Sequence, residues 1–281
     1  MNSFSFGQYY PGNSIIHRLD PRTKLLFTFV YMITIFLVKS YIGYLVTAIL
    51  FTTIVFVSTV PWKVVFKSIR AVLFLLIFTL LINLLFYKEG TELFAWKFIH
   101  ITVGGIDYSI KMLLRLTLLV MGASILTFTT TSTELTDALE YLLKPLKYLH
   151  IPVHDLAIIM SIALRFIPTL IEETQKIMNA QKARGANLDT GNFFQRVKAM
   201  LPILIPLFVS AFRRADELAD ALDARCYNAT DKRTKMKVLK FGMADFVVLI
   251  ITVIFVTLIC LDSYMLGGAY LDKLIYSFIV G

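Results

Sequence analysis

Two arginines stand at matching places in two stretches of the chain. The stretches NAQKARGANLD (179–189) and DALDARCYN (220–228) both contain the pattern Ala, two residues, Ala, Arg, and the arginines are Arg184 and Arg225. An arginine near a helix C-terminus can simply complement the helix dipole, which is worth about 0.3–1 kcal/mol. A guanidinium can also bind a carboxylate through two parallel hydrogen bonds, which lysine cannot do. Because the spacing occurs twice, we favour two slim helix tips that each enter an acidic groove of a partner.

Other groups that could do chemistry give weaker signals. His150 and His154 are four residues apart, but Pro152 lies between them and disrupts the regular helix that metal binding at this spacing requires. We therefore expect no metal site. The chain contains no Gly-x-x-x-x-Gly-Lys-Ser/Thr loop for nucleotide phosphates and no arrangement typical of a catalytic site. We expect no catalytic residue and no cofactor in this chain, and any ATP would be bound by another chain.

Charged residues also flank Pro168. Arg165, Glu172 and Glu173 lie where one expected helix changes from apolar to polar. Ionisable residues at membrane depth are candidates for function. Residues at this place can equally lie at the membrane interface, and that simpler interpretation is the one we favour.

The composition is that of a protein with several membrane-spanning helices. Of the 281 residues, 57% are hydrophobic and 17% are charged, and the mean hydropathy is +0.72; soluble domains contain about a quarter charged residues. A net charge of +9 could suggest nucleic acid. In a membrane protein the excess of positive charge on cytoplasmic segments explains it, so we expect no nucleic-acid partner. Two cysteines, Cys226 and Cys260, cannot form a disulfide framework.

The apolar stretches predict membrane spans near residues 23–38, 41–60, 71–87, 108–131 and 244–262. Several are shorter than the ~20 residues that a spanning helix needs, so their ends are soft. Gly90 and Gly104-Gly105 frame an expected loop over residues 88–107.

The distribution of lysine and arginine favours a cytoplasmic N-terminus. In that orientation the cytoplasmic segments 1–24, 61–70 and 132–240 carry 22 of the 28 Lys and Arg residues, an excess that is typical of cytoplasmic segments. The segment 132–240 accounts for this excess. The segments 1–24 and 61–70 together carry six Lys and Arg residues, as many as the segments on the outer side. We expect a multi-pass protein of the cell (plasma) membrane with its N-terminus in the cytoplasm.

The segment 132–240 contains two expected helices that share a plan. Each begins apolar, as LAIIMSIALRFIPTLI (156–171) and MLPILIPLFVSAF (200–212), and each ends polar at one of the two arginines. A capping box of Thr131 and Glu134 precedes them. The prolines expected to kink or end helices here are Pro145, Pro168, Pro202 and Pro206.

These patterns together predict the fold class. We expect an all-α, polytopic membrane helical bundle with long kinked cytoplasmic helices. Its parts are N-terminal membrane helices (1–131), a cytoplasmic or interfacial region with two long helices (132–240), and a C-terminal membrane helix and tail (241–281).

Three groups of residues together resemble a known family. They are the opening GQYYPGNSIIHRLDPRTKLL (7–26), the stretch TTTSTELTDALEYLLKPL (129–146), and the two triplets Ala183-Arg184-Gly185 and Ala224-Arg225-Cys226. The family is the transmembrane T component of energy-coupling factor (ECF) transporters, and the resemblance covers essentially the whole chain. Cys226 stands where the family often has glycine, which leaves the arginine's role intact but makes the expected helix stop less abrupt.

The resemblance implies a membrane bundle with long kinked cytoplasmic coupling helices, which makes residues 132–240 the coupling-helix region. It also implies a coupling role in an ATP-driven ECF-type ABC importer for a micronutrient, a vitamin or a metal. The triplets around Arg184 and Arg225 would each bind one of two ABC-type ATPase subunits, which hold the ATP and magnesium. The difference between Gly185 and Cys226 is compatible with two non-identical ATPases. A separate S component in the lipid bilayer would choose the substrate, and ATPase closure would tilt the coupling helices and reorient it. The residues expected to face the S component are Leu164, Ile167, Pro168, Leu201, Pro202, Leu204 and Pro206.

Two alternatives are a conventional ABC permease and a secondary transporter. A secondary transporter is expected to show repeats with broken helices around a midplane site, whereas the repeat in this sequence lies in the coupling region and not in the spans. An intramembrane enzyme would need a catalytic set facing the bilayer interior, and the spans offer mainly Thr and Ser.

Overall fold

The chain folds into two compact units. The computed structural model describes residues 9–87, 92–96, 99–149, 153–186, 192–227 and 241–266. Of the described residues, those within 9–148 and 241–266 form one unit, called the membrane unit below, and those within 149–227 form the other, the coupling unit.

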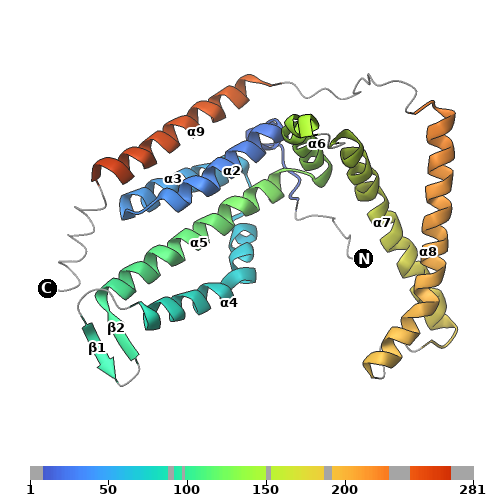
Figure 1. Ribbon diagram of the computed structural model, residues 1–281, viewed down its shortest axis with the longest axis horizontal. Coiled ribbons are helices and arrows are strands. Elements are labelled where there is room, and N and C mark those ends of the chain that lie inside the picture. Colours follow the sequence, from blue (N-terminus) through green and yellow to red (C-terminus); the bar gives the residue numbers. More distant parts are fainter. Residues whose placement is uncertain are drawn as a thin grey trace. The chain divides into compact units, whose positions relative to one another are not determined.

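The membrane unit consists of helices and one short hairpin (Figure 1). Its elements are α1 (Ile15–Arg18), α2 (Pro21–Leu37), α3 (Tyr41–Ser58), α4 (Trp62–Phe86), β1 (Glu92–Trp96), β2 (Ile99–Thr102), α5 (Val103–Thr129), α6 (Ser132–Leu143), the 3-10 helix η1 (Lys144–Leu149), α9 (Met243–Leu261) and the π-helical turn η2 (Asp262–Leu266). The coupling unit contains α7 (Val153–Ala183) and α8 (Phe193–Ala224). The predicted all-α fold class is confirmed, with the hairpin as an addition.

Five helices in the described part of the chain are long and apolar enough to cross a membrane, namely α3, α4, α5, α8, and α9 with the beginning of η2. The chain is therefore a multi-pass membrane protein. Four predicted spans correspond to α3, α4, α5 and α9. The fifth forms α2, whose 17 residues are slightly short for an untilted span. The sequence assigns α8 to the coupling region, yet α8 has the length and composition of a span.

Polar side chains begin several of these helices by accepting hydrogen bonds from backbone N–H groups that would otherwise lack a partner. Ser40 caps α3 and Thr102 caps α5, where it accepts from the Gly105 N–H at 3.1 Å. The capping box predicted at the beginning of α6 is confirmed: the Thr131 side chain accepts from the Glu134 N–H, and the Glu134 carboxylate accepts from the Thr131 N–H, both at 3.3 Å.

The loop predicted over residues 88–107 is only partly a loop. Strands β1 and β2 pair in antiparallel register from Glu92–Thr102 to Trp96–Ile99, and α5 begins at Val103. Gly105 therefore lies in the first turn of a helix. A Cβ at Gly105 would stand 3.1 Å from the Tyr87 carbonyl oxygen, so this glycine allows the end of α4 to approach α5 closely.

The core of the membrane unit surrounds α2. This helix packs on α5, α6 and α9, and α5 also packs on α3 and α4. Tyr31 lies at the centre, stacked between the rings of Phe27 and Phe255 at 6.1 and 6.2 Å, and its hydroxyl donates to the Leu118 carbonyl at 3.1 Å. A Cβ at Gly122 of α5 would overlap the Tyr31 ring. The two helices can approach this closely only because residue 122 has no side chain.

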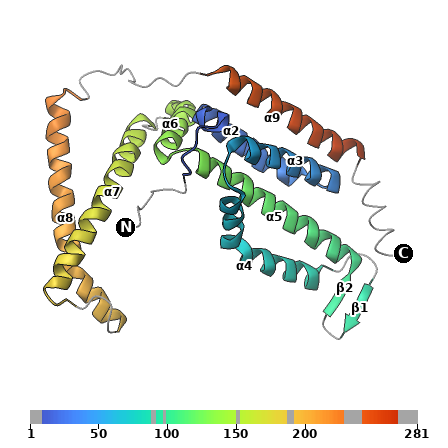
Figure 2. The same ribbon diagram turned by 180° about the vertical axis from the view of Figure 1, so that it is seen from behind.

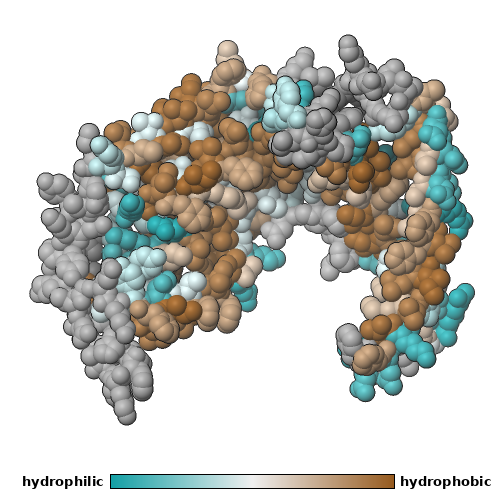
Figure 3. Space-filling model, in the orientation of Figure 1, coloured by the Kyte–Doolittle hydropathy of each residue, from teal (hydrophilic) through white to brown (hydrophobic). Residues whose placement is uncertain are grey.

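The outward side chains of the membrane unit are mostly apolar, as the brown surface in Figure 3 illustrates. Phe56 and Phe74 are 80% and 81% exposed, and α9 exposes Phe246 and Ile250. Large exposed apolar surfaces of this kind mark contact with a membrane or a partner.

The contacts place α6 in the membrane unit because it packs on α2. The division between the units therefore falls at Leu149 rather than at residue 132, where the sequence places the beginning of the coupling region. Pro145 lies in η1 directly after α6 ends.

The two helices of the coupling unit pack on each other and have 31 and 32 residues. Pro168 lies inside α7, and Pro202 and Pro206 lie inside α8, so none of these prolines ends its helix. The helix α8 changes direction along its length. In Figure 1 and in the reverse view of Figure 2, α7 and α8 cross, and their C-terminal ends lie at opposite ends of the pair.

Candidate functional site

The first arginine lies at a sharp helix stop. After Ala183 the Gly185 N–H donates to the Lys182 carbonyl at 3.0 Å, and the next N–H reaches back to the Gln181 carbonyl at 3.0 Å. This is the pair of bonds of a Schellman motif, which satisfies the last carbonyls of a helix. Gly185 has φ +85°, in the left-handed region that glycine enters without strain. The chain turns away here and leaves Arg184 exposed on the tip.

The second arginine lies at the same kind of stop. The Cys226 N–H donates to the Asp223 carbonyl at 2.9 Å, and the Tyr227 N–H donates to the Leu222 carbonyl at 3.0 Å. Each bond repeats one from the first tip at an offset of 41 residues. Arg225 is exposed directly after the last helical residue. The two sequence triplets therefore end their helices in one geometry.

Cys226 adopts the left-handed conformation itself, with φ +53°. The expectation of a less abrupt stop at this position is wrong, because the Schellman bonds hold the residue in a conformation that costs a non-glycine residue about 1–2 kcal/mol. The similarity of the two tips thus persists at a local energetic cost.

All residues of the two triplets are exposed at the helix ends: Ala183, Arg184, Gly185, Ala224, Arg225 and Cys226. Small residues precede each arginine, so the guanidinium is the largest group at each tip. Binding of a partner by these residues stays a prediction.

One polar contact, called the clasp below, joins α7 and α8 where Glu173 meets Arg214 and Ser210. The Glu173 carboxylate forms an ion pair with Arg214 Nη2 at 2.9 Å, and it accepts a hydrogen bond from the Ser210 hydroxyl at 2.5 Å. The Arg214 and Glu173 side chains are 36% and 23% exposed, so water weakens the ion pair without eliminating it. Neither interpretation offered from the sequence for Glu173 included this contact.

The clasp sits at equivalent positions of the repeat. Glu173 and Arg214 are 41 residues apart, as are the two tip arginines. Each clasp residue precedes the arginine of its own tip by eleven positions, 173 to 184 and 214 to 225. Eleven residues make about three helical turns, so the clasp residue and the tip arginine of each helix lie on nearly the same face.

The residues expected to face an S component lie on exposed or half-buried surface. Pro168, Leu201, Pro202, Leu204 and Pro206 are exposed, and Leu164 and Ile167 are half-buried. Nothing in the structure identifies what covers them, and their role stays a prediction.

The same surface of α8 has further apolar members that the sequence analysis did not select. They are Ile205, Phe208, Val209 and Phe212, between 55% and 68% exposed. The apolar run 200–212 was the available signal. The structure shows that Ile203 is the one buried residue of this run. The exposed apolar surface therefore continues past Pro206, which the sequence alone did not show.

The motif Asp20-Pro21-Arg22-Thr23-Lys24 has a structural role that the sequence did not assign. Lys24 is buried and donates to the carbonyl oxygens of Thr129 and His17 at 2.9 and 3.0 Å. The Tyr10 N–H donates to the Phe128 carbonyl at 2.9 Å. The N-terminal segment thus satisfies carbonyls at the end of α5, where a cation also complements the helix dipole.

The other residues of this motif bind α6 and α9. The Asp20 N–H donates to Asp245 Oδ1 at 3.0 Å, and Asp245 Oδ2 accepts from the Gly242 N–H at 2.7 Å. The Arg22 guanidinium lies 3.7 Å from the centre of the Tyr141 ring of α6, within the range of a cation–π contact. The motif therefore joins four helices of the membrane unit at one end of α2.

His17 fixes the segment before this motif. Its Nδ1 lies 2.6 Å from the Ser14 hydroxyl, and its Nε2 lies 3.0 Å from the Tyr10 carbonyl oxygen. Burial lowers the pKa of His17, and the hydrogen bond to Tyr10 opposes this effect. The neutral ring is therefore favoured at this position.

The histidine pair considered for metal binding falls largely outside the described residues: His150 is not described, and neither is the His154 side chain. Within the ranges that are described, no group of three or more His, Cys, Asp and Glu residues could hold a metal ion.

Proteins with known names are similar to this chain over almost its full length. A family described as "Cobalt transport protein" matches residues 12–236. A protein of Ruminiclostridium cellulolyticum named "Energy-coupling factor transporter transmembrane protein EcfT" is 51% identical over 94% of this chain and 99% of that protein. Proteins of the same name from Clostridium kluyveri and Bacillus subtilis are 44% and 42% identical, over 95% and 92% of this chain and 99% and 98% of those proteins.

Proposed function

This chain belongs to the family of energy-coupling factor transporter transmembrane proteins, and we propose that it couples two ATPase subunits to a substrate-binding S component in the membrane. The ATPases bind ATP and magnesium, and this chain transmits their movement without hydrolysing ATP itself. The transported substrate is a micronutrient, a vitamin or a metal ion. Membership of this family favours the coupling role over that of a conventional ABC permease or a secondary transporter.

The matching helix ends carry this proposal. Two tips of the same geometry, each with an exposed arginine, suit two sockets of the same kind. The backbone hydrogen bonds fix where each arginine leaves its helix, and the planar fork of its side chain matches a carboxylate. One ATPase receives Arg184 and the other Arg225.

The clasp supports a path for the movement. The ion pair between Glu173 and Arg214 ties α7 to α8 three turns before each tip, so a displacement of one tip is passed to the other helix. The exposed apolar residues of both helices, from Leu164 to Pro206, then act on the S component.

The arginines are tested by replacing them with alanine and purifying the chain together with its ATPases. Each single change, Arg184→Ala or Arg225→Ala, should weaken the complex, since removing one partner of a buried charge pair costs about 2–5 kcal/mol. The double change should abolish co-purification. Arg196→Ala is the matched control, because Arg196 is an exposed arginine at the other end of α8. A transport-competent complex of the double variant would contradict the assigned role.

We also propose that the N-terminus and both tips lie in the cytoplasm of a bacterial cell. The lysine and arginine distribution supports this orientation. Cys226 is exposed on the second tip, so in a Cys260→Ser chain it reports the side on which the tip lies. A membrane-impermeant thiol reagent should label Cys226 only after the cells are opened, and labelling of intact cells would reverse the orientation.

A further inference from the structure

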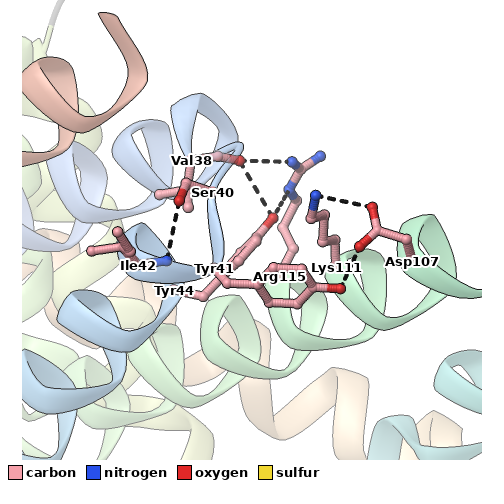
Figure 4. A network of polar contacts seen from close by, with 8 residues as sticks. All are labelled: Val38, Ser40, Tyr41, Ile42, Tyr44, Asp107, Lys111 and Arg115. Carbon is pink, nitrogen blue, oxygen red and sulfur yellow. Dashed lines mark hydrogen bonds and ion pairs between the residues drawn. The ribbon is translucent and has the colours of Figure 1, made fainter. Parts of the chain in front are cut away.

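Positive charge gathers where the connection between α2 and α3 meets α5 (Figure 4). Lys39 lies in that connection and is exposed. Lys111 and Arg115 are four residues apart on α5, so they share one face of the helix. Like charges at this spacing destabilise a helix unless other groups compensate.

Lys111 is compensated by a carboxylate. Its ammonium group lies 2.9 Å from Asp107 Oδ2, and the other carboxylate oxygen of Asp107 accepts from the Tyr41 hydroxyl at 2.5 Å. The same ammonium group lies 4.8 Å from the centre of the Tyr41 ring. Asp107 therefore matches one of the three positive charges.

Arg115 is held by neutral acceptors. Its Nη2 donates to the Val38 carbonyl at 3.0 Å, and its Nε donates to the Tyr44 hydroxyl at 3.2 Å. These bonds fix the guanidinium without cancelling its charge. A guanidinium has five N–H donors. The described part of the chain accepts from two of them, so the others can bind a ligand. Figure 4 shows the guanidinium at the edge of the network, beside the Lys111 ammonium group.

A pocket of about 180 Å³ lies among these side chains. Its lining residues are Lys39, Tyr108, Lys111, Met112 and Arg115. No carboxylate lines it among the residues described. One water molecule needs roughly 10–15 Å³ of such space, so the pocket has room for a ligand much larger than water. Its lining combines three cationic side chains with the Met112 thioether and the Tyr108 ring.

The surroundings place this pocket at the edge of the membrane-spanning region. Lys39 lies between two predicted spans, and the Tyr87 and Tyr108 rings stack at 4.7 Å close by. Tyrosine is enriched where membrane spans meet the headgroup layer. Asp262 of η2 adds a carboxylate near Gly43 of α3, so this carboxylate and Asp107 together offset two of the three positive charges named above.

We propose that this pocket binds the phosphate group of an anionic phospholipid. Arg115 and Lys39 bind the phosphate oxygens, and Met112 and Tyr108 contact the glycerol and the first carbons of the chains. A soluble phosphate offers the same anionic group, but it has no apolar part to match these two walls. The proposal stands on the pocket and its charges and is independent of the coupling role.

Native mass spectrometry of the purified full chain tests the site, with phosphatidylglycerol and phosphatidylcholine as probes. Lys39→Gln should weaken phosphatidylglycerol binding about fivefold, the effect of one lysine near a lipid surface. Lys39 has no hydrogen bond or ion pair with the described part of the chain, so this variant keeps its fold. Lys63→Gln, which removes an exposed lysine at the beginning of α4, is the control and should bind as the unchanged chain does. Phosphatidylcholine, whose choline cation offsets the charge of its phosphate, should bind more weakly than phosphatidylglycerol to the unchanged chain.

Two outcomes would overturn the proposal. Equal phosphatidylglycerol binding by the Lys39→Gln variant and the unchanged chain would mean that the pocket does not hold the lipid phosphate. Tighter binding of inorganic phosphate than of phosphatidylglycerol, with the phosphate binding lost in the Lys39→Gln variant, would identify the ligand as soluble phosphate and not a lipid.

Discussion

The membrane unit and the coupling unit differ in what holds their helices together. In the membrane unit, large side chains such as Tyr31, Phe51 and Phe128 are almost fully buried between helices. In the described part of the coupling unit, the buried apolar residues are Val153, Ala157 and Ile203. The coupling helices therefore leave most of their apolar surface uncovered. A small core and the clasp hold them together.

This difference indicates where each unit obtains its stability. The membrane unit is held by its own packing and by the polar contacts of Lys24 and Asp245, so its helices have little freedom to move apart. The coupling unit leaves apolar faces exposed, and faces of this kind mark contact with a membrane or a partner. A transmission element has to change position in response to a partner, and a pair of helices with a small core suits that task.

The largest expected effect breaks the packing of the membrane unit. Gly122→Val places a branched side chain where the Tyr31 ring stands, and overpacking of this kind costs about 1–3 kcal/mol. Thermal unfolding in detergent measures the loss. Gly122→Ala should lose less, and adding Tyr31→Leu to it should recover part of that loss. Unchanged stability of Gly122→Val would mean that this unit packs as loosely as the coupling unit.

The next effect compares the two helix tips. Gly185→Ala forces a side chain into the left-handed region and should destabilise the first tip by about 1 kcal/mol, whereas Cys226→Gly should stabilise the second tip by a similar amount. Hydrogen exchange at the Ala186 and Tyr227 amides reports each tip separately. Cys226→Ser keeps the strain and serves as the control. If Gly185→Ala and Cys226→Gly both destabilise their tips, or both stabilise them, the two tips do not share one backbone conformation.

A smaller effect concerns the clasp. Glu173→Gln removes the ion pair with Arg214 and should lower the stability of the coupling unit by only about 0.5–1 kcal/mol, because the pair is partly exposed. Transport by the complex should fall more than ATP hydrolysis does. The exchange Glu173→Arg with Arg214→Glu should restore transport, and Glu172→Gln, at the exposed neighbouring position, should leave it unchanged. Failure of the exchange to restore transport would exclude the clasp as the path of movement.

The smallest effect on stability is expected on the exposed face of α8. Phe208 is 60% exposed, so Phe208→Ala should change the stability of the isolated chain by less than about 0.5 kcal/mol. Recovery of the S component in the purified complex should nevertheless fall. A loss of stability as large as that of Gly122→Val would show that α8 has a packed core after all.

The sequence predicted the features that depend on local patterns. The spans followed from apolar runs of sufficient length, and the capping box at Thr131 followed from residue types at a fixed spacing. The matched tips around Arg184 and Arg225 were also visible as a repeat. Such features depend on neighbouring residues in the chain, so a single sequence contains their signal.

By itself, the sequence determined that this is a membrane protein of the all-α class with two similar arginine tips. Only the tertiary structure decided that Cys226 adopts the backbone conformation of Gly185, that Glu173 pairs with Arg214, and that Lys24 binds the end of α5. The reason is physical: each of these depends on a group that is distant in the chain or on backbone geometry that residue type does not specify. Spacing along one helix predicts which residues share a face, but contact with a second helix depends on how the two helices pack.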